Sequence, residues 1–180
     1  MSAHPPVQFD RALRPEWFDR ALALRAETKN AAEFRAAMAA HLRAQVKGRW
    51  TLDKLVQQFQ RTVGFRSPLP PERLAEALRI LSKAEAAARP PVRLQLLVEA
   101  IPFLRDCAQT INRLADASGD EFTLAQLTER MQERYGHRGT IPRRVRNVLQ
   151  TLEAFGALGH RHGKWERLGA LSDATGTLPP

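Results

Sequence analysis

The sequence predicts a mainly α-helical protein with a small β-hairpin in its last third. Apolar residues recur every three or four positions through the first 116 residues, as they do along one face of an amphipathic helix. No strand-like alternation of apolar and polar residues occurs before residue 120. Glycines then punctuate the stretch after residue 155, as expected around a two-stranded hairpin.

Four helices are expected in the first half of the chain, after a flexible segment over residues 1–13. The first opens at Pro15, because a proline in the first turn of a helix removes no hydrogen bond that the helix needs. Asn30 and Glu33 have capping-box spacing at the start of the second helix, which we expect Gly48 to end. The expected ranges are residues 14–27, 31–47, 51–63 and 71–88. On the third helix, the residues expected to face outward are Lys54, Gln57, Gln58 and Arg61.

Prolines mark the next boundaries. The Arg-Pro-Pro run at 89–91 is expected to stop the fourth helix, since proline cannot continue a helix. Residues 92–116 again have a helical pattern, but Pro102 interrupts it, so we expect either a kink or two helices that meet there. The resulting division is a helical domain over residues 14–98, a second domain over residues 100–168 and a flexible tail over residues 169–180.

The pattern changes after residue 120. Residues 121–123 are too few for a helix and could pair as a short strand, while Thr123 can cap a helix that Gly136 ends. Thr140 is expected to cap the following helix, which has Pro142 in its first turn. The residues after this helix fit a hairpin. Its expected strands are residues 157–160 and 164–168.

Helical phasing divides residues 141–155 into an apolar face and a basic, polar face. An advance of 100° per residue gathers six apolar side chains in one arc. They are Ile141, Val145, Val148, Leu149, Leu152 and Phe155. The opposite arc is centred near Arg143, Asn147 and Gln150, with Arg144 and Arg146 on its two shoulders. These residue types hydrogen-bond to base edges and phosphates in DNA complexes.

The order of strand, helix, tight turn, helix and hairpin, preceded by a further helix, resembles a winged helix-turn-helix domain. The resemblance covers residues 101–168. It implies that helix 141–155 lies in the major groove of DNA and that the hairpin, residues 157–168, is the wing. The hypothesised groove contacts are Arg143, Asn147 and Gln150, and the hypothesised phosphate contacts are Arg138, Arg144, Arg146, Arg161 and Lys164.

The charge of the chain favours a polyanionic partner. There are 28 Lys and Arg residues against 19 Asp and Glu residues, which gives a net charge of +9. Between His137 and Leu168, seven basic residues stand against two acidic ones, so +5 of this +9 falls within 32 residues. Two alternatives remain open. A high-GC genome also favours arginine over lysine, and an arginine-rich helix face can simply be solvated.

No enzyme motif or metal site is evident in the sequence. It has no phosphate-binding glycine loop, dinucleotide fingerprint or nucleophile elbow. Its single cysteine, Cys107, falls on the apolar face of a helix, where an inert thiol is expected. His137, His160 and His162 have no evident further ligand. We therefore expect no enzymatic activity, no cofactor and no bound metal.

The sequence predicts a soluble, cytoplasmic protein. The first residues lack the basic segment and apolar run of a secretory signal. No apolar stretch approaches the roughly 18 to 20 residues that a membrane span needs. A lone cysteine is consistent with a reducing compartment.

The run from "AIPFLRDC" to "EAFGAL", residues 100–158, is similar to the C-terminal part of small proteins of bacterial phage-defence islands, among them the A-type accessory protein of BREX systems. The helical first half, with "RAQVKGRWTLDKLVQQFQRT", is similar in style. The resemblance implies a small, non-enzymatic DNA-binding subunit that works beside a methyltransferase and an ATPase.

These observations lead to the hypothesis of a double-stranded DNA-binding accessory subunit of a phage-defence system. Its N-terminal helices are expected to bind a partner subunit or a second copy of the chain. Two alternatives stay open. One is a dimeric transcriptional regulator of the same fold, and the other is a protein-interaction adaptor whose winged helix does not contact DNA.

Overall fold

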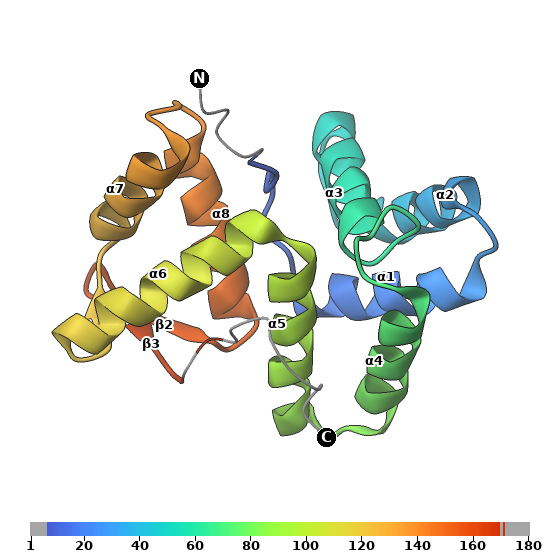
Figure 1. Cartoon of the computed structure of the whole chain (residues 1–180). Coiled ribbons are helices and arrows are strands. Elements are labelled where there is room, and N and C mark those ends of the chain that lie inside the picture. The colour runs from blue at the N-terminus through green and yellow to red at the C-terminus, as the bar shows by residue number, and fades with distance from the viewer. Residues whose placement is uncertain (1–6, 170, 172–180) are drawn as a thin grey trace.

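The computed structural model describes residues 7–169 and 171. Within them the chain is mainly helical and carries one small antiparallel sheet near its C-terminal end, as the sequence predicts (Figure 1). The elements are α1 (Pro15–Glu27), α2 (Ala31–Leu42), α3 (Arg49–Thr62), α4 (Pro71–Lys83), the 3-10 helix η1 (Ala86–Ala88), α5 (Arg89–Ala100), α6 (Pro102–Ser118), β1 (Glu121–Phe122), α7 (Leu124–Tyr135), α8 (Ile141–Ala154), β2 (Leu158–Arg161) and β3 (Lys164–Arg167).

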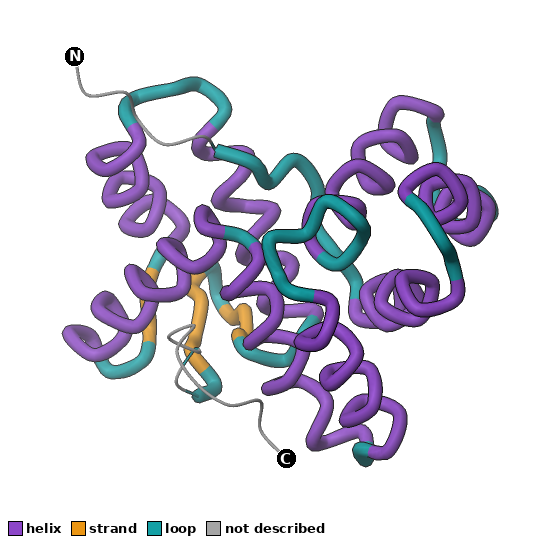
Figure 2. Tube along the Cα trace, turned by 45° about the vertical axis from the view of Figure 1, so that its right-hand side comes forward, coloured by secondary structure: helices purple, strands orange, loops and turns teal. Residues whose placement is uncertain are grey.

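The helices form two groups with α5 between them. We call α1–α4 the N-terminal lobe and α6–β3 the C-terminal lobe; α5 packs against both α4 and α6 (Figures 1 and 2). The buried side chains of the two lobes form one continuous hydrophobic core. Phe18 of α1 meets Phe155, just beyond α8, edge to face with ring centroids 5.9 Å apart. This contact fixes the C-terminal end of α8 against the N-terminal lobe.

Two predicted helix boundaries are wrong. α2 ends at Leu42, and Gly48 instead precedes α3 as its N-cap residue, with a φ of 86° that favours glycine. α4 ends at Lys83, and the Arg-Pro-Pro run opens α5, with proline in its first turn. The reason is that proline cannot continue a helix but its fixed φ suits a helix start.

Pro102 separates two helices, which is one of the two predicted outcomes. Ile101, between α5 and α6, has extended backbone angles (φ −123°, ψ 96°). This conformation is the one favoured before proline. The junction turns the chain from the inner helix α5 into the long helix α6.

The three strands pair in the order β1, β3, β2, with both pairings antiparallel. Phe122 of β1 lies opposite Trp165 of β3, which in turn lies opposite His160 of β2. The predicted cap of α7 by Thr123 is confirmed, because its hydroxyl accepts from the Gln126 amide; the Gln126 side chain in turn accepts from the Thr123 amide, which completes a capping box. The sheet thus holds β1 and the hairpin together at the end of the C-terminal lobe.

Residues 7–13 pack between the two lobes, although the sequence predicted a flexible segment. Phe9 and Leu13 are buried. The Gln58 side chain, expected to face outward from α3, is buried instead, and its Oε1 accepts from the amides of Asp10 and Arg11 at 3.1 and 3.2 Å. A buried amide is stable here because the extended segment offers it backbone partners.

One residue of the predicted flexible tail is bonded to α6. Leu171 exchanges two hydrogen bonds with the side chain of Asn112, and most of that tail lies outside the described residues.

Across the described parts of the chain, every helix is too short or too polar to cross a membrane.

Candidate nucleic-acid interface

α8 carries the polar face that the sequence singles out. Pro142 stands in its first turn, as predicted. Thr140 does occupy the position before the helix, but its backbone is helical (φ −84°, ψ −17°) and its side chain makes no capping hydrogen bond, so the predicted cap is wrong. A capping side chain needs an extended backbone at this position to reach the free amides.

The apolar face of α8 is confirmed, because all six side chains predicted to face the core are buried. On the opposite side, Arg143, Arg146 and Gln150 are exposed. None of these three has a hydrogen bond or ion pair from its side chain within the described residues. They span about 10 Å along the helix, at 1.5 Å per residue. We call them the α8 stripe.

Arg144 is turned away from this stripe and toward the N-terminal segment. Its Nη2 lies 3.0 Å from Oδ1 of Asp10, and its side chain is only 18% exposed. Burial raises the pKa of Asp10, but the hydrogen bond and charge of Arg144, and the charges of Lys54 and Arg143, outweigh burial and lower the pKa below its ordinary value. Arg144 is therefore occupied by an internal partner in this conformation.

Asn147 and Thr151 also face the N-terminal segment. The Thr151 hydroxyl accepts from the Leu13 amide at 2.9 Å and donates to the Asn147 carbonyl at 2.8 Å. Asn147 is half-buried, and its Nδ2 has no partner among the described residues. Of the three residues predicted to meet the groove, Arg143 and Gln150 are thus exposed and Asn147 is partly covered.

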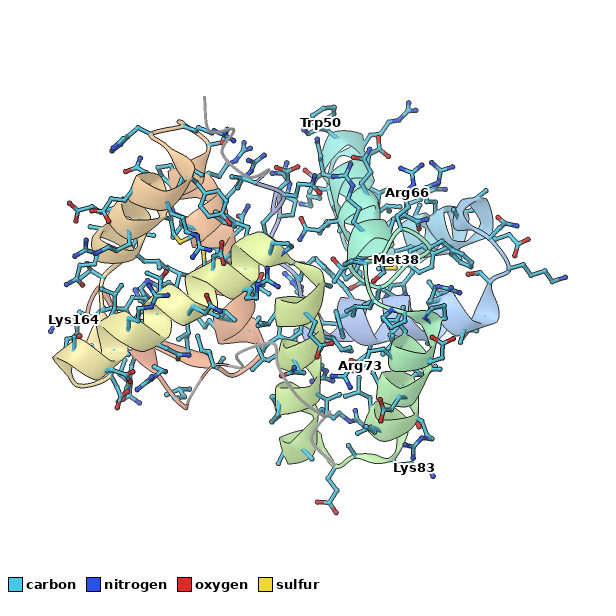
Figure 3. All side chains as sticks on the ribbon, viewed as in Figure 1. Met38, Trp50, Arg66, Arg73, Lys83 and Lys164 are labelled. Carbon is cyan, nitrogen blue, oxygen red and sulfur yellow. The ribbon has the colours of Figure 1, made fainter. Side chains whose placement is uncertain are left out.

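The predicted phosphate-binding residues outside α8 lie on its two flanks. Arg138 is exposed in the corner between α7 and α8, and Arg161 is exposed at the end of β2. Lys164 projects from the outer edge of the C-terminal lobe, where its Nζ lies 2.6 Å from Oε2 of Glu121 (Figure 3). Both members of this pair are more than half exposed, so the pair is weak and open to exchange.

A groove runs between α8 and the hairpin. It has a volume of about 340 Å³, and its lining includes Arg146, Gln150 and His160. The His160 ring stacks on Trp165 with centroids 4.4 Å apart, and Trp165 is buried against the lobe. This stacking joins the two strands of the hairpin, and the burial of Trp165 holds the hairpin against the lobe.

A second groove, of about 490 Å³, lies on the other side of the α8 stripe, against the N-terminal lobe. Its lining includes Gln150 and Asn147 of α8, and three cations that the sequence analysis did not assign to the site. These cations are Arg11, Arg14 and Lys47. Sequence alone gave no signal for them, because only the packing of the N-terminal segment and the N-terminal lobe beside α8 brings them there.

The described residues give little sign of a metal site, a reactive thiol or a pair of catalytic acids. They contain no cluster of three or more His, Cys, Asp or Glu side chains that could hold a metal ion. Cys107 is fully buried, and burial raises the pKa of its thiol well above the ordinary value, which disfavours the reactive thiolate. Asp116 and Asp120 both pair with Arg167, at 2.7 and 2.6 Å. These acids therefore hold β3 to the end of α6.

Comparisons of the chain with protein families, with curated proteins and with solved structures found no match.

Proposed function

We propose that the protein binds double-stranded DNA without catalysing a reaction, and that its C-terminal lobe is a winged helix-turn-helix domain. In this assignment α7 and α8 are the helix-turn-helix, α8 is the recognition helix and the β2–β3 hairpin is the wing. The pairing of β1 with β3 and the tight corner between α7 and α8 support it.

The α8 stripe is the observation that carries the proposal. Arg143, Arg146 and Gln150 offer hydrogen-bond donors that no acidic side chain of the described residues engages. An exposed length of about 10 Å suits the major groove of B-DNA, which is about 12 Å wide. The grooves on either side of the stripe leave room for the two sugar-phosphate backbones that border a major groove.

The polar and basic residues of the C-terminal lobe are proposed to have different roles, according to their positions. Arg143 and Gln150, at the two ends of the stripe, are proposed to meet base edges. The proposed phosphate contacts are Arg138, Arg146, Arg161 and Lys164. Arg144 is held by Asp10 and is assigned to positioning the N-terminal segment, which changes its role from the sequence hypothesis.

A titration of labelled random duplex at two salt concentrations tests this function. Four phosphate contacts give a salt slope of about 3.6, so the affinity is expected to fall about 150-fold between about 50 and 200 mM salt. Arg79→Ala, an exposed arginine on α4, serves as the control because it lies outside every proposed contact. Absence of binding at the lower salt concentration would instead support the adaptor alternative.

Sequence preference separates a general DNA-binding subunit from a regulator. Arg143→Ala is expected to relax any preference by about 1 to 3 kcal/mol, whereas loss of a phosphate contact weakens binding to all sequences alike. Protection of a symmetric site by a dimer would support the regulator. A place in a phage-defence system remains a proposal from the resemblance, and co-purification with a methyltransferase or an ATPase tests it.

A further inference from the structure

A second basic site lies on the N-terminal lobe, between α2, α3 and the loop that follows α3. A pocket of about 190 Å³ is present there, and Arg66 points into this region (Figure 3). The residues that line it are Arg35, Gln57, Gln60, Arg61 and Arg66. None of them lines either groove beside α8. The site is therefore separate from the proposed DNA interface.

Three arginines converge on this pocket without a counter-charge. Arg35, Arg61 and Arg66 are exposed, and none of them has an ion pair with an acid of the described residues. Arg61 makes one long hydrogen bond, from Nη1 to Oε1 of Gln8 at 3.4 Å. Like charges gathered at one place repel, and a bound anion removes that repulsion.

Gln60 lies beneath the arginines as an unsatisfied polar group. It is 2% exposed, and neither its Nε2 nor its Oε1 has a hydrogen-bond partner among the described residues. Buried amides nearly always have partners, so an unpaired one that lines a pocket offers a donor and an acceptor to a bound molecule. Gly64 leaves room for this side chain, because a Cβ there would lie 2.9 Å from the Gln60 Oε1.

The loop over the pocket is rigidly held, so the site is formed before any ligand binds. Phe65 packs edge to face on Phe34, with centroids 6.4 Å apart, and the Arg25 guanidinium lies 3.8 Å above the Phe65 ring. The Ser67 hydroxyl donates to the Thr62 carbonyl at 2.7 Å. A preformed site loses little conformational entropy when it binds a ligand.

A larger pocket of about 410 Å³ adjoins the first and shares Gln57, Arg61 and Arg66 with it. Its lining adds an apolar wall and five polar or charged side chains, among them Lys54 and the Asp10 carboxylate that pairs with it at 3.7 Å. The wall is formed by Pro68, Ala100, Ile101 and Pro102. A ligand with a charged end and a less polar body would therefore fill the two pockets together.

We propose that these pockets bind a small phosphate-bearing molecule. The phosphate oxygens contact the three arginines, whose planar donor groups match them, and accept from the Gln60 amide. The remainder of the ligand lies in the larger pocket. Leu55 of α3 lines the groove beside α8, where the duplex is proposed to bind. Gln57, which lines both pockets, lies about 160° around α3 from Leu55, so the pockets open on a different face of this helix. A small ligand is therefore favoured over the duplex bound at α8.

The test is a titration of the whole chain with inorganic phosphate at constant ionic strength, followed by NMR of the Gln60 side-chain amide. We expect a saturable shift, and tighter binding of adenosine monophosphate, whose base and sugar can enter the larger pocket. Arg66→Gln and Arg35→Gln are each expected to weaken phosphate binding about 10-fold or more, the effect of losing one charge-assisted hydrogen bond. The matched control Arg79→Gln is expected to bind phosphate as the natural chain does.

Equal phosphate affinities in Arg66→Gln and Arg79→Gln, or a shift that does not saturate, overturn the proposal. Duplex affinity measured on the same variants tests whether the arginines bind the phosphates of DNA instead. If Arg66→Gln weakens duplex binding as much as Arg161→Ala does, then the arginines contact DNA and the small-molecule site is rejected. Failure of the chain to bind duplex at all leaves the phosphate titration unaffected, so the two proposals fail separately.

Discussion

Replacement of Asp10 by asparagine is expected to strengthen DNA binding and to weaken the fold. The substitution keeps the shape of the side chain but removes the negative charge that lies 3.0 Å from Arg144 and 3.7 Å from Lys54. Arg144 stands on a shoulder of α8, next to the stripe. Freed from its internal partner, it can reach one further phosphate.

The structure sets the size of both effects. One added phosphate contact raises the salt slope by about 0.9, so the fall in affinity between about 50 and 200 mM salt grows from about 150-fold to about 500-fold. The lost ion pair is partly buried, with side chains 18% and 27% exposed, and is expected to contribute about 1 to 2 kcal/mol. For a chain of this length, that loss lowers the midpoint of thermal unfolding by about 2 to 8 °C.

Duplex titration and thermal unfolding of Asp10→Asn measure the two effects. Asp19→Asn is the matched control, because it changes the net charge equally and also removes an arginine's partner, Arg93, whose Nε lies 2.8 Å from it. This control lies outside the proposed DNA interface and is expected to leave the salt slope unchanged. An unchanged slope in Asp10→Asn as well would refute the prediction that the freed Arg144 guanidinium reaches a phosphate.

The pH dependence of stability gives a second readout of the same pair. The pKa of Asp10 is lower in the folded chain than its ordinary value of 3.8. The stability that the pair contributes is therefore fully present above pH 3.8 and is lost as the pH falls through the lower, folded-state pKa. The difference in unfolding free energy between the natural chain and Asp10→Asn is expected to vanish below that value.

Three further changes test separate parts of the structure. Thr151→Val leaves the buried amide of Leu13 unpaired and is expected to lower the unfolding free energy by about 1 to 3 kcal/mol in denaturant titrations. Tyr135→Phe removes the hydrogen bond to Asp106. Burial and this bond raise the pKa of Tyr135, so the natural chain loses stability above about pH 10, where the tyrosine ionises in the unfolded chain. We expect this loss of stability to be smaller in the variant. Arg161→Ala is expected to lower the salt slope of duplex binding by about 0.9 for every sequence tested.

Each of these three predictions has an experimental result that would contradict it. Thr151→Ser retains the hydroxyl and should unfold closer to the natural chain than Thr151→Val does; if Thr151→Val, which retains the methyl group, is as stable as the natural chain, the hydrogen bond to Leu13 does not contribute as proposed. Equal alkaline unfolding of Tyr135→Phe and the natural chain would show that another group titrates. A sequence-dependent loss in Arg161→Ala would contradict a purely backbone contact by the hairpin.

The parts of the fold that the sequence predicts well depend on short-range patterns. The apolar face of α8 follows from residue spacing alone, and the cap of α7 follows from a threonine placed just before an apolar helical pattern. The exposure of Arg143 and Gln150 follows from the same spacing. These features need no knowledge of what the rest of the chain does.

The misassigned features depend on contacts between distant residues. Asp10 and Arg144 are 134 positions apart, and nothing in the sequence around either residue indicates that they meet. Gln58 looked like a surface residue because its partners belong to an extended segment with no periodic pattern. Gly48 was misplaced for a different reason, since a glycine can stand at either end of a helix.

The packing of residues 7–13 on α8 also has a consequence during protein synthesis. Residues 7–13 leave the ribosome well before α8, the helix on which they pack, has been made. At about 5 to 20 residues per second, Phe9 and Leu13 stay exposed for roughly 7 to 28 seconds before the α8 surface that covers them exists. A chain truncated before α8 is therefore expected to expose this apolar segment permanently and to aggregate.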